Sequence, residues 1–253
     1  MITKEILIET GKKKGLKNKE HIEKTYFQDI FLFNLFKATN KFVFKGGTAL
    51  YKFYGLSRFS EDLDFSLASE LSIDEIEEIM RICIKNIDIF EIKSIKKIKD
   101  SILFKIKCKG ILTEKNTLRI DVSLKNKILL GFDVKNYVSD YIDISPFSLR
   151  VLKPEEMISE KFHALIKRDK ARDLYDLFFL LRSFKFNKAL VEEKLKIFGM
   201  TYNISLIKEK INKIKPIWEK ELRAFVLEEL PDYGIVKEYV EKALDEVKSH
   251  PKL

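Results

Sequence analysis

Residues 45–65 read KGGTALYKFYGLSRFSEDLDF, and this stretch decides the fold. The apolar run 42–44 before it predicts a short buried strand, which the two glycines end. From Thr48 a helical pattern resumes, and Gly55 is placed to end that helix. Residues 61–67 then alternate between apolar and polar side chains, as a half-buried strand does. The stretch therefore predicts a strand, a glycine turn, a short helix and a second strand in close succession.

Carboxylates mark the polar face of the second strand. Asp62 and Asp64 are separated by one residue, so both side chains point to the same face of a strand. Such a pair repels itself unless a cation lies between the two groups, and Mg²⁺ takes hard oxygen ligands of this kind. Asp121 stands within another alternating segment, and an adjacent strand would add it as a third ligand. A plain solvated strand face is the alternative.

The glycine turn is a second candidate feature. Gly46 and Gly47 lie between a strand and a helix, where a backbone without side chains can approach a phosphate. The start of the helix adds free N–H groups and a favourable dipole. Thr48 could cap the helix or bind a phosphate oxygen. A tight turn with a threonine N-cap is the alternative.

The rest of the chain divides into a mixed first part and a helical second part. After Pro154, which fits the first turn of a helix, strand signals stop and helical patterns run to about Lys248. We therefore predict an α+β fold, in which a small mixed, mostly antiparallel sheet with helices (residues 1–152) is followed by an α-helical C-terminal region (residues 153–253). Further helices are expected over 19–40 and from an N-cap at Ser72 to about 87, and further strands around 104–109, 119–124 and 147–152.

Composition sets the class of protein. The chain has 253 residues, of which 45% are hydrophobic, and this is ample for a packed core. The 48 basic and 39 acidic side chains give a net charge of +9, which suits a nucleic acid or nucleotide partner. Cys83 and Cys108 lie in apolar segments without zinc spacing, so two buried free thiols are expected. The apolar runs are too short to span a membrane and no signal peptide is apparent, so we expect a cytoplasmic protein.

Ionisable side chains interrupt apolar stripes in the helical part. The helical neighbours of Lys161 at three and four steps are all apolar, so this lysine either extends out to solvent or reaches an anion. Asp173 and Asp176 lie three residues apart on the expected core-facing side of the next helix. Buried carboxylates need partners, and Lys161, Arg168 or Arg172 could serve. A structural salt-bridge network between two helices is the alternative to a functional site.

Four segments in sequence order carry a family resemblance. They are residues 45–65 with the glycine pair and the two aspartates, residues 118–122 around Asp121, residues 160–168 with Lys161, and residues 170–177 with Asp173 and Asp176. Together they resemble the AbiEii/AbiGii-type toxin nucleotidyltransferases, relatives of the MenT toxins and of the polymerase β-like nucleotidyltransferase superfamily. Thr48 stands where the superfamily often has serine, which keeps the hydroxyl.

The resemblance implies nucleotidyl transfer and a role for each catalytic residue. Asp62 and Asp64 would bind Mg²⁺, which bridges the phosphates of the nucleotide. Asp121 would complete the metal site or act as the base on an acceptor hydroxyl. Lys161 would contact the triphosphate, and Asp173 would orient Lys161 or the nucleotide. The residues implied in substrate binding are Gly46, Gly47, Thr48, Arg58, Arg172 and Asp176.

The same resemblance implies an acceptor and a partner. In relatives the acceptor can be RNA, typically the 3′ end of a tRNA, and the toxin is paired with an antitoxin protein. We therefore expect Mg²⁺-dependent transfer of a nucleoside monophosphate from an NTP to RNA, by the toxin of a toxin–antitoxin or abortive-infection system. A small molecule or a protein as the acceptor, or a nucleotide-binding module without turnover, are the alternatives.

One strand face could meet a nucleic acid. Lys105, Lys107 and Lys109 alternate along a predicted strand, so they share a face that could follow a phosphate backbone. A strand at the edge of the sheet, protected by its lysines against pairing with other chains, is the alternative explanation.

Overall fold

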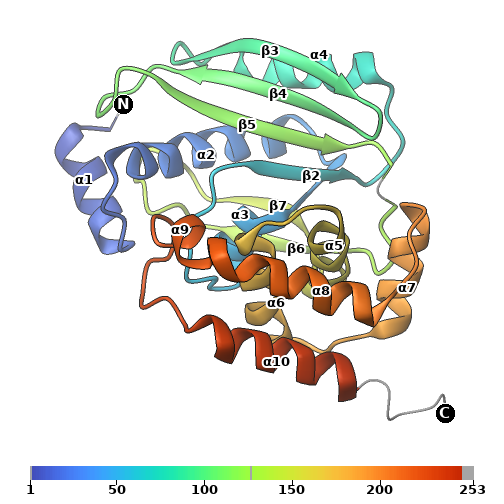
Figure 1. Cartoon of the computed structure of the whole chain (residues 1–253). Helices are drawn as coiled ribbons and strands as arrows, with labels where there is room; N and C mark the ends of the chain where they lie inside the picture. Colours follow the sequence, from blue (N-terminus) through green and yellow to red (C-terminus); the bar gives the residue numbers. More distant parts are fainter. Residues whose placement is uncertain (1, 126, 247–253) are drawn as a thin grey trace. The chain divides into compact units, whose positions relative to one another are not determined.

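The computed structural model describes residues 2–125 and 127–246. The chain forms two compact units, and Figure 1 shows the elements of each along the sequence. Unit 1 comprises Met1–Gly55 and Phe59–Leu152, and unit 2 comprises Leu56–Arg58 and Lys153–Leu253. The chain therefore enters unit 2 twice, first for a short segment and then for its C-terminal part.

A mixed sheet forms the core of unit 1. In the described residues its strands are β1 (Phe42–Lys45), β2 (Leu63–Leu67), β3 (Phe90–Ile98), β4 (Ser101–Cys108), β5 (Asn116–Ser123), β6 (Phe132–Tyr137) and β7 (Phe147–Leu152). Their order across the sheet is β3-β4-β5-β2-β1-β7-β6. The pairs β1–β7 and β2–β5 are parallel, and the other neighbours are antiparallel. The predicted α+β fold with a mostly antiparallel sheet is confirmed.

The sequence analysis did not predict strands β3 and β6, and each omission has a local structural reason. In β3 the pairing register shifts between Ile92 and Ser94, and this irregularity breaks the two-residue alternation that marks a strand. Strand β6 lies at the edge of the sheet, and only its last residue, Tyr137, is buried. Its side chains therefore show little of the apolar alternation of a half-buried strand.

The helices of unit 1 are α1 (Lys4–Lys13), α2 (Lys19–Ala38), α3 (Gly46–Phe53) and α4 (Ile73–Ile84). Helix α2 contacts both α4 and β5, and α4 contacts β3, so these two helices cover one face of the sheet (Figure 1). The predicted helices over 19–40 and after Ser72 are confirmed. Ser72 and Glu75 form a capping box at the start of α4, which binds the free N–H groups there.

Alternation within the central strands separates an apolar face from a polar one. Phe104 and Ile106 of β4, and Ile120 of β5, are buried on the face that the helices cover. Cys83 and Cys108 are buried free thiols, as predicted, and burial raises the pKa of each to about 12. Polar and charged side chains therefore gather on the opposite face of β4 and β5.

A buried ion pair holds α3 against α2. The Lys52 Nζ lies 2.6 Å from Oδ1 of Asp29, and both side chains are sealed from solvent. The hydroxyl groups of Tyr137 and Ser139 also donate to the Asp29 carboxylate. Because a buried charge is costly without partners, this network favours one position of α3 on α2.

Unit 2 is helical in its described residues. Its elements are α5 (Pro154–Lys167), α6 (Ala171–Ser183), α7 (Lys188–Ile197), α8 (Ile204–Ile214), the 3₁₀ helix η1 (Lys215–Ile217), α9 (Trp218–Leu222) and α10 (Tyr233–Glu246). Helix α5 contacts α6, α7 and α8, and α6 also contacts α9 and α10. Pro154 begins α5, as predicted. The end of the last helix, expected near Lys248, lies outside the described residues.

Trp218 marks the interior of unit 2. Its ring lies 6.2 Å from the ring of Tyr175 and 5.9 Å from the ring of Tyr233, centroid to centroid. The indole N–H donates to the backbone carbonyl of Pro231, so its polar end is satisfied.

Among the described helices of the whole chain, none is long and apolar enough to cross a bilayer.

Gly46 allows the helix α3 to begin directly at the end of β1. Its φ is +76°, a value that favours glycine, and a Cβ at this position would collide with the carboxylate of Asp64 on β2. The backbone of the helix start therefore lies against the Asp64 side chain. The close approach links the glycine pair of the sequence to the first carboxylate of β2.

We expect Gly46→Ala to destabilise the protein more than Gly55→Ala. The two glycines have nearly the same φ, +76° and +77°, so the left-handed conformation costs alanine about 1–2 kcal/mol at either site. Only Gly46 adds a collision, because nothing lies within 4 Å of a Cβ at Gly55. Urea titrations followed by circular dichroism would measure both free energies of unfolding. Equal losses of unfolding free energy in the two variants would show that the Asp64 side chain moves aside without an energetic cost.

Candidate active site

The register of β2 brings the predicted carboxylates together. Asp64 lies directly opposite Asp121 on the parallel strand β5. Directly opposed residues point to the same face, so the two side chains stand next to each other. Asp62 precedes β2 and lies two residues before Asp64, and all three aspartates are partly exposed. Asp121 thus lies on the strand next to Asp64, as expected, and its role as a metal ligand stays a prediction.

Lys45 lies in line with Asp64 and Asp121 across three neighbouring strands, and the sequence analysis assigned it no role. It is the last residue of β1, lies opposite Asp64 on the antiparallel side and is only 8% exposed. A lysine that ends a strand of otherwise apolar residues is the signal that could have identified it. A buried cation in line with Asp64 and Asp121 lowers the cost of placing two carboxylates side by side.

Thr48 has a different contact from the two that its position in the sequence suggested. Helix α3 begins at Gly46, so Thr48 lies inside the first turn and Lys45 is the N-cap residue, without a side-chain cap. The alternative explanation of Thr48 as a helix N-cap is therefore wrong. The Thr48 side chain is fully buried, and its hydroxyl donates to the backbone carbonyl of Asp62. This bond ties the start of α3 to the segment that carries the aspartates.

The aspartates do not form a complete metal site by themselves. Within residues 2–125 and 127–246, no group of three or more His, Cys, Asp or Glu side chains could hold a metal ion as it stands. The carboxylates of Asp64 and Asp121 are nevertheless the hard oxygen donors that Mg²⁺ prefers, and Mg²⁺ usually takes one or two carboxylates and keeps other positions for substrate phosphates. The donor set therefore fits a magnesium ion that is completed by the nucleotide.

A second cluster of charges lies within unit 2, where Asp176 is its centre. The Asp176 carboxylate binds the Arg58 guanidinium at two points, Nε at 2.7 Å and Nη2 at 2.6 Å. It also lies 2.6 Å from Nζ of Lys161. Asp176 and Arg58 are sealed from solvent, at 0% and 2% exposure, and Lys161 is 9% exposed. The carboxylate is thus held by two cations from different segments of the chain.

Asp173 completes the cluster one turn earlier on α6. Its carboxylate lies 3.3 Å from Nζ of Lys161. It also accepts bonds from Nε and Nη2 of Arg168, at 2.7 and 3.1 Å. Lys161 therefore does not extend out to solvent, and its anionic partners are Asp173 and Asp176.

Electrostatics keeps the whole cluster ionised. Burial raises the pKa of Asp176, but Arg58 and Lys161 outweigh it, so the pKa lies below its usual value. The pKa of Asp173 is lowered in the same way, against burial, chiefly by Lys161 and Arg168. Burial lowers the pKa of Lys161, and the two carboxylates overcome this and raise it. Each group thus stabilises the charged form of its partners.

Two arginines lie elsewhere than the sequence suggested. Arg58 was expected near a phosphate, and its guanidinium is instead buried against Asp176. Arg172 was one of three possible partners for the α6 carboxylates, and its guanidinium lies over the ring of Phe225, 5.5 Å from the centroid. The sequence alone could not show which of these arginines pairs with a carboxylate of α6, because the pairing depends on how distant segments pack.

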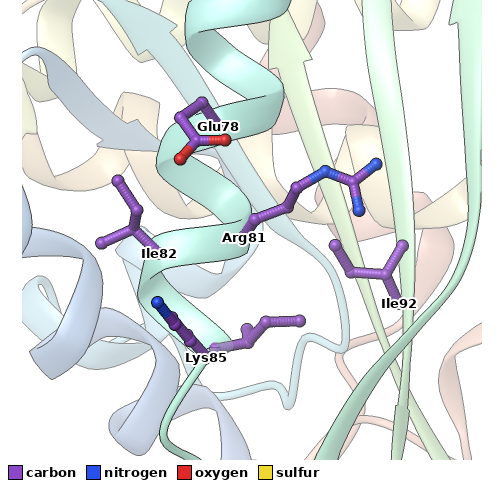
Figure 2. A pocket seen from close by; sticks show the side chains of 6 residues that line it. Glu78, Arg81, Ile82, Lys85 and Ile92 are labelled. Carbon is purple, nitrogen blue, oxygen red and sulfur yellow. The ribbon is translucent and has the colours of Figure 1, made fainter.

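Two hollows in unit 1 differ in the residues that line them. One, of about 380 Å³, is lined by Asp62 and by basic side chains of β3, β4 and β5. The other, of about 400 Å³, lies between α4 and Ile92 of β3; Figure 2 shows Arg81 and Ile82 leaving the helix in different directions around it. Only the first hollow contains a residue of the predicted active site.

Comparison with known proteins identifies the family. Residues 30–246 match the family described as nucleotidyl transferase AbiEii toxin, type IV TA system. The chain belongs to the AbiEii toxin family. The predicted resemblance is confirmed, and membership supports a toxin nucleotidyltransferase, which implies a nucleotide substrate and an antitoxin partner.

Solved structures of similar fold agree with the AbiEii assignment. MenT4, a nucleotidyltransferase toxin from Mycobacterium tuberculosis H37Rv, is 18% identical with a TM-score of 0.71, over 99% of this chain and 91% of that chain. JHP933 from Helicobacter pylori is 24% identical with a TM-score of 0.57, over 92% of this chain and 96% of that chain. At these identities the likeness concerns the fold. Comparison with curated proteins gave no match.

We expect Asp176→Asn to lower the free energy of unfolding of unit 2 of the AbiEii chain by about 3–5 kcal/mol, because it leaves two buried cations short of a negative charge. Trp218 is the only tryptophan and is buried in unit 2, so its fluorescence in a urea titration reports on this unit. Asp169→Asn is the control, because that aspartate pairs with Lys210 at the surface. A loss no larger than that of the control would contradict a stabilising network.

The cluster also predicts a pH dependence. The folded pKa of Asp173 and Asp176 lies below the usual 3.8, so their contribution to stability is present above about pH 4 and is lost as the pH falls through the folded pKa. The raised pKa of Lys161 gives a contribution that is lost only above about pH 10.5. Urea titrations of Trp218 fluorescence below pH 4 should therefore show a steeper fall for the wild type than for Asp176→Asn. Parallel curves would contradict the lowered pKa of Asp176.

Proposed function

We propose that this AbiEii-family protein transfers a nucleoside monophosphate from an NTP to the 3′ end of an RNA, with tRNA as the acceptor and Mg²⁺ as the required ion. One observation carries the proposal: β2 pairs with β5 so that Asp64 stands opposite Asp121, beside the start of α3. In a family of nucleotidyl transferase toxins, this pairing supplies the carboxylates that a nucleotide-bound metal needs.

The residues around the pair have complementary roles in the proposed site. Asp62, Asp64 and Asp121 would hold the Mg²⁺, which when bound neutralises the charge that develops on the phosphates. The backbone N–H groups of Gly46 and Gly47 lie at the start of α3, where the helix dipole favours an anion, and would bind the triphosphate. The Thr48 hydroxyl is engaged with the carbonyl of Asp62, so we assign Thr48 the task of fixing this loop.

The proposed reaction is a displacement at phosphorus. The acceptor's 3′ hydroxyl oxygen forms a bond to the α-phosphorus of the NTP, the bond from that phosphorus to the bridging oxygen breaks, and pyrophosphate leaves. The proton of the hydroxyl passes to a carboxylate, for which Asp121 is the candidate. If Asp121 acts as this base, Asp62 and Asp64 alone would hold the metal.

We assign Lys161 the contact with the triphosphate, as membership of the nucleotidyl transferase toxin family suggests. The carboxylates of Asp173 and Asp176 bind its Nζ, so they would position Lys161. Arg58 would act through Asp176 rather than on a phosphate.

We expect Asp64→Asn and Asp121→Asn to lower nucleotidyl transfer by about a hundredfold or more, because the metal's stabilisation of developing charge is worth several kcal/mol. The assay incubates the protein with total tRNA, Mg²⁺ and each α-labelled NTP in turn, and follows label in RNA. Asp62→Ala should lose activity as well. Asp133→Asn is the matched control, because Asp133 is a strand aspartate on the far edge strand β6.

The same assay separates the alternatives. Label on a protein or a small molecule would show transfer to a different acceptor, and label on nothing with any NTP would overturn the proposed function. Growth inhibition on expression gives an independent readout, since an enzymatic toxin should lose it in Asp64→Asn and keep it in Asp133→Asn. Inhibition that survives in both variants would indicate a binding module without turnover.

A further inference from the structure

A row of basic side chains lies beside the aspartates on the polar face of the sheet in unit 1. Lys96, Lys105 and Arg119 line the 380 Å³ hollow that also contains Asp62. They come from β3, β4 and β5, one from each of three neighbouring strands, and all are exposed. None of the three takes part in the metal or triphosphate site proposed above.

Strand register places the cations on the same face of the sheet as the aspartates. Lys105 lies directly opposite Arg119, and Leu103 lies directly opposite Asp121, across β4 and β5. On its other side Leu103 is opposite Lys96 of β3. Opposed residues share a face, as do residues two apart on one strand, so the cations and Asp121 lie on the same face of the sheet.

Within the described residues, none of these three cations lies within ion-pair distance of an acidic side chain. By contrast, Lys97 lies 3.3 Å from the carboxylate of Glu77. Lys96, Lys105 and Arg119 therefore keep their charge available for an anion from solution.

The arrangement costs stability unless an anion binds there. Like charges directly opposite each other on paired strands destabilise a sheet, and Lys105 and Arg119 are such a pair. Protection of a sheet edge does not explain the lysines of β4, because β4 lies between β3 and β5. That alternative from the sequence is wrong.

We propose that Lys96, Lys105 and Arg119 bind successive phosphates of the acceptor RNA strand and lead its 3′ end to the aspartates. The inference rests on the proposed function and assigns the acceptor its surface. Neighbouring strands are about 4.8 Å apart, so long side chains from three strands can contact successive phosphates of one extended strand. The hydroxyls of Ser94 and Thr117, which also line the hollow, add donors suited to phosphate and ribose oxygens.

A nucleic acid suits this surface better than a protein does. The hollow is lined by four basic side chains, two carboxylates and only two apolar side chains, and of the basic side chains Lys24 pairs with Glu61. Protein-binding surfaces have apolar, aromatic-rich centres from which charged side chains, lysine above all, are depleted. Phosphates positioned by exposed lysine and arginine are the usual contact of proteins with nucleic acids.

The test compares two triple variants with the same loss of charge. One is Lys96→Gln/Lys105→Gln/Arg119→Gln. The control is Lys12→Gln/Lys85→Gln/Lys97→Gln, which removes exposed lysines from α1, from the C-cap of α4 and from β3. Binding of a fluorescently labelled single-stranded RNA is measured by anisotropy over a range of salt concentrations. Binding of a fluorescent NTP with Mg²⁺ is measured in the same proteins.

We expect the first variant to bind RNA less tightly, with a salt dependence (the slope of log K against log salt) smaller by about 2, since each phosphate contact on a single strand contributes about 0.7. NTP binding should be unchanged, and the control should behave as the wild type. Equal losses in both variants would overturn the inference, because only net charge would then matter. An unchanged RNA affinity in the first variant would overturn it too.

Failure of the inference and failure of the proposed function give different results. If the wild type transfers label to a protein or a small molecule and binds no RNA even at low salt, the surface is not an RNA site, although nucleotidyl transfer stands. If the first variant loses RNA binding and the wild type transfers no label, the surface binds RNA and the proposed function is wrong.

Discussion

The parallel pairing of β2 with β5 is the constraint on which unit 1 depends. It sets Asp64 beside Asp121, where two like charges oppose the pairing. What holds the register is the other half of each strand, because Leu63, Phe65 and Ile120 are fully buried. A shift of one residue would turn the carboxylates into the apolar core and the apolar side chains out of it. Burial of one face thus stabilises an unfavourable arrangement of charges on the other.

The charge cluster of unit 2 is built on the opposite principle. Asp173 and Asp176 are sealed in the helical core, and the protein supplies their cations from α5 and from the segment of Arg58. Such a cluster is costly to form and strongly destabilised when one member is lost. In the sheet the aspartates stay partly exposed, so an ion from solution can reach them. In the proposed function the pair in the sheet would bind the metal and the pair in unit 2 would position Lys161.

Much of the fold follows from local patterns, and the site follows only in part. The alternation of β2, β4 and β5 and the capping signal of Ser72 were sufficient to predict these elements. Strand β3 was missed because its register shift removes the alternation, and β6 because an edge strand has little buried surface. Spacing alone placed Asp62 and Asp64 on one face. The partnership of Arg58 with Asp176 and the row position of Lys45 depend on contacts between distant segments, which have no signature in a single sequence.

The passage of the chain through unit 2 at Leu56–Arg58 bears on how the protein is made and how it evolves. On the ribosome Arg58 emerges long before Asp176 has been synthesised, so its guanidinium stays without its buried partner until the C-terminal helices appear. A C-terminal half expressed alone would lack this cation altogether. Recombination that exchanged only that half between relatives would place a foreign α6 opposite this arginine. The two halves of the coding sequence are therefore expected to be inherited together.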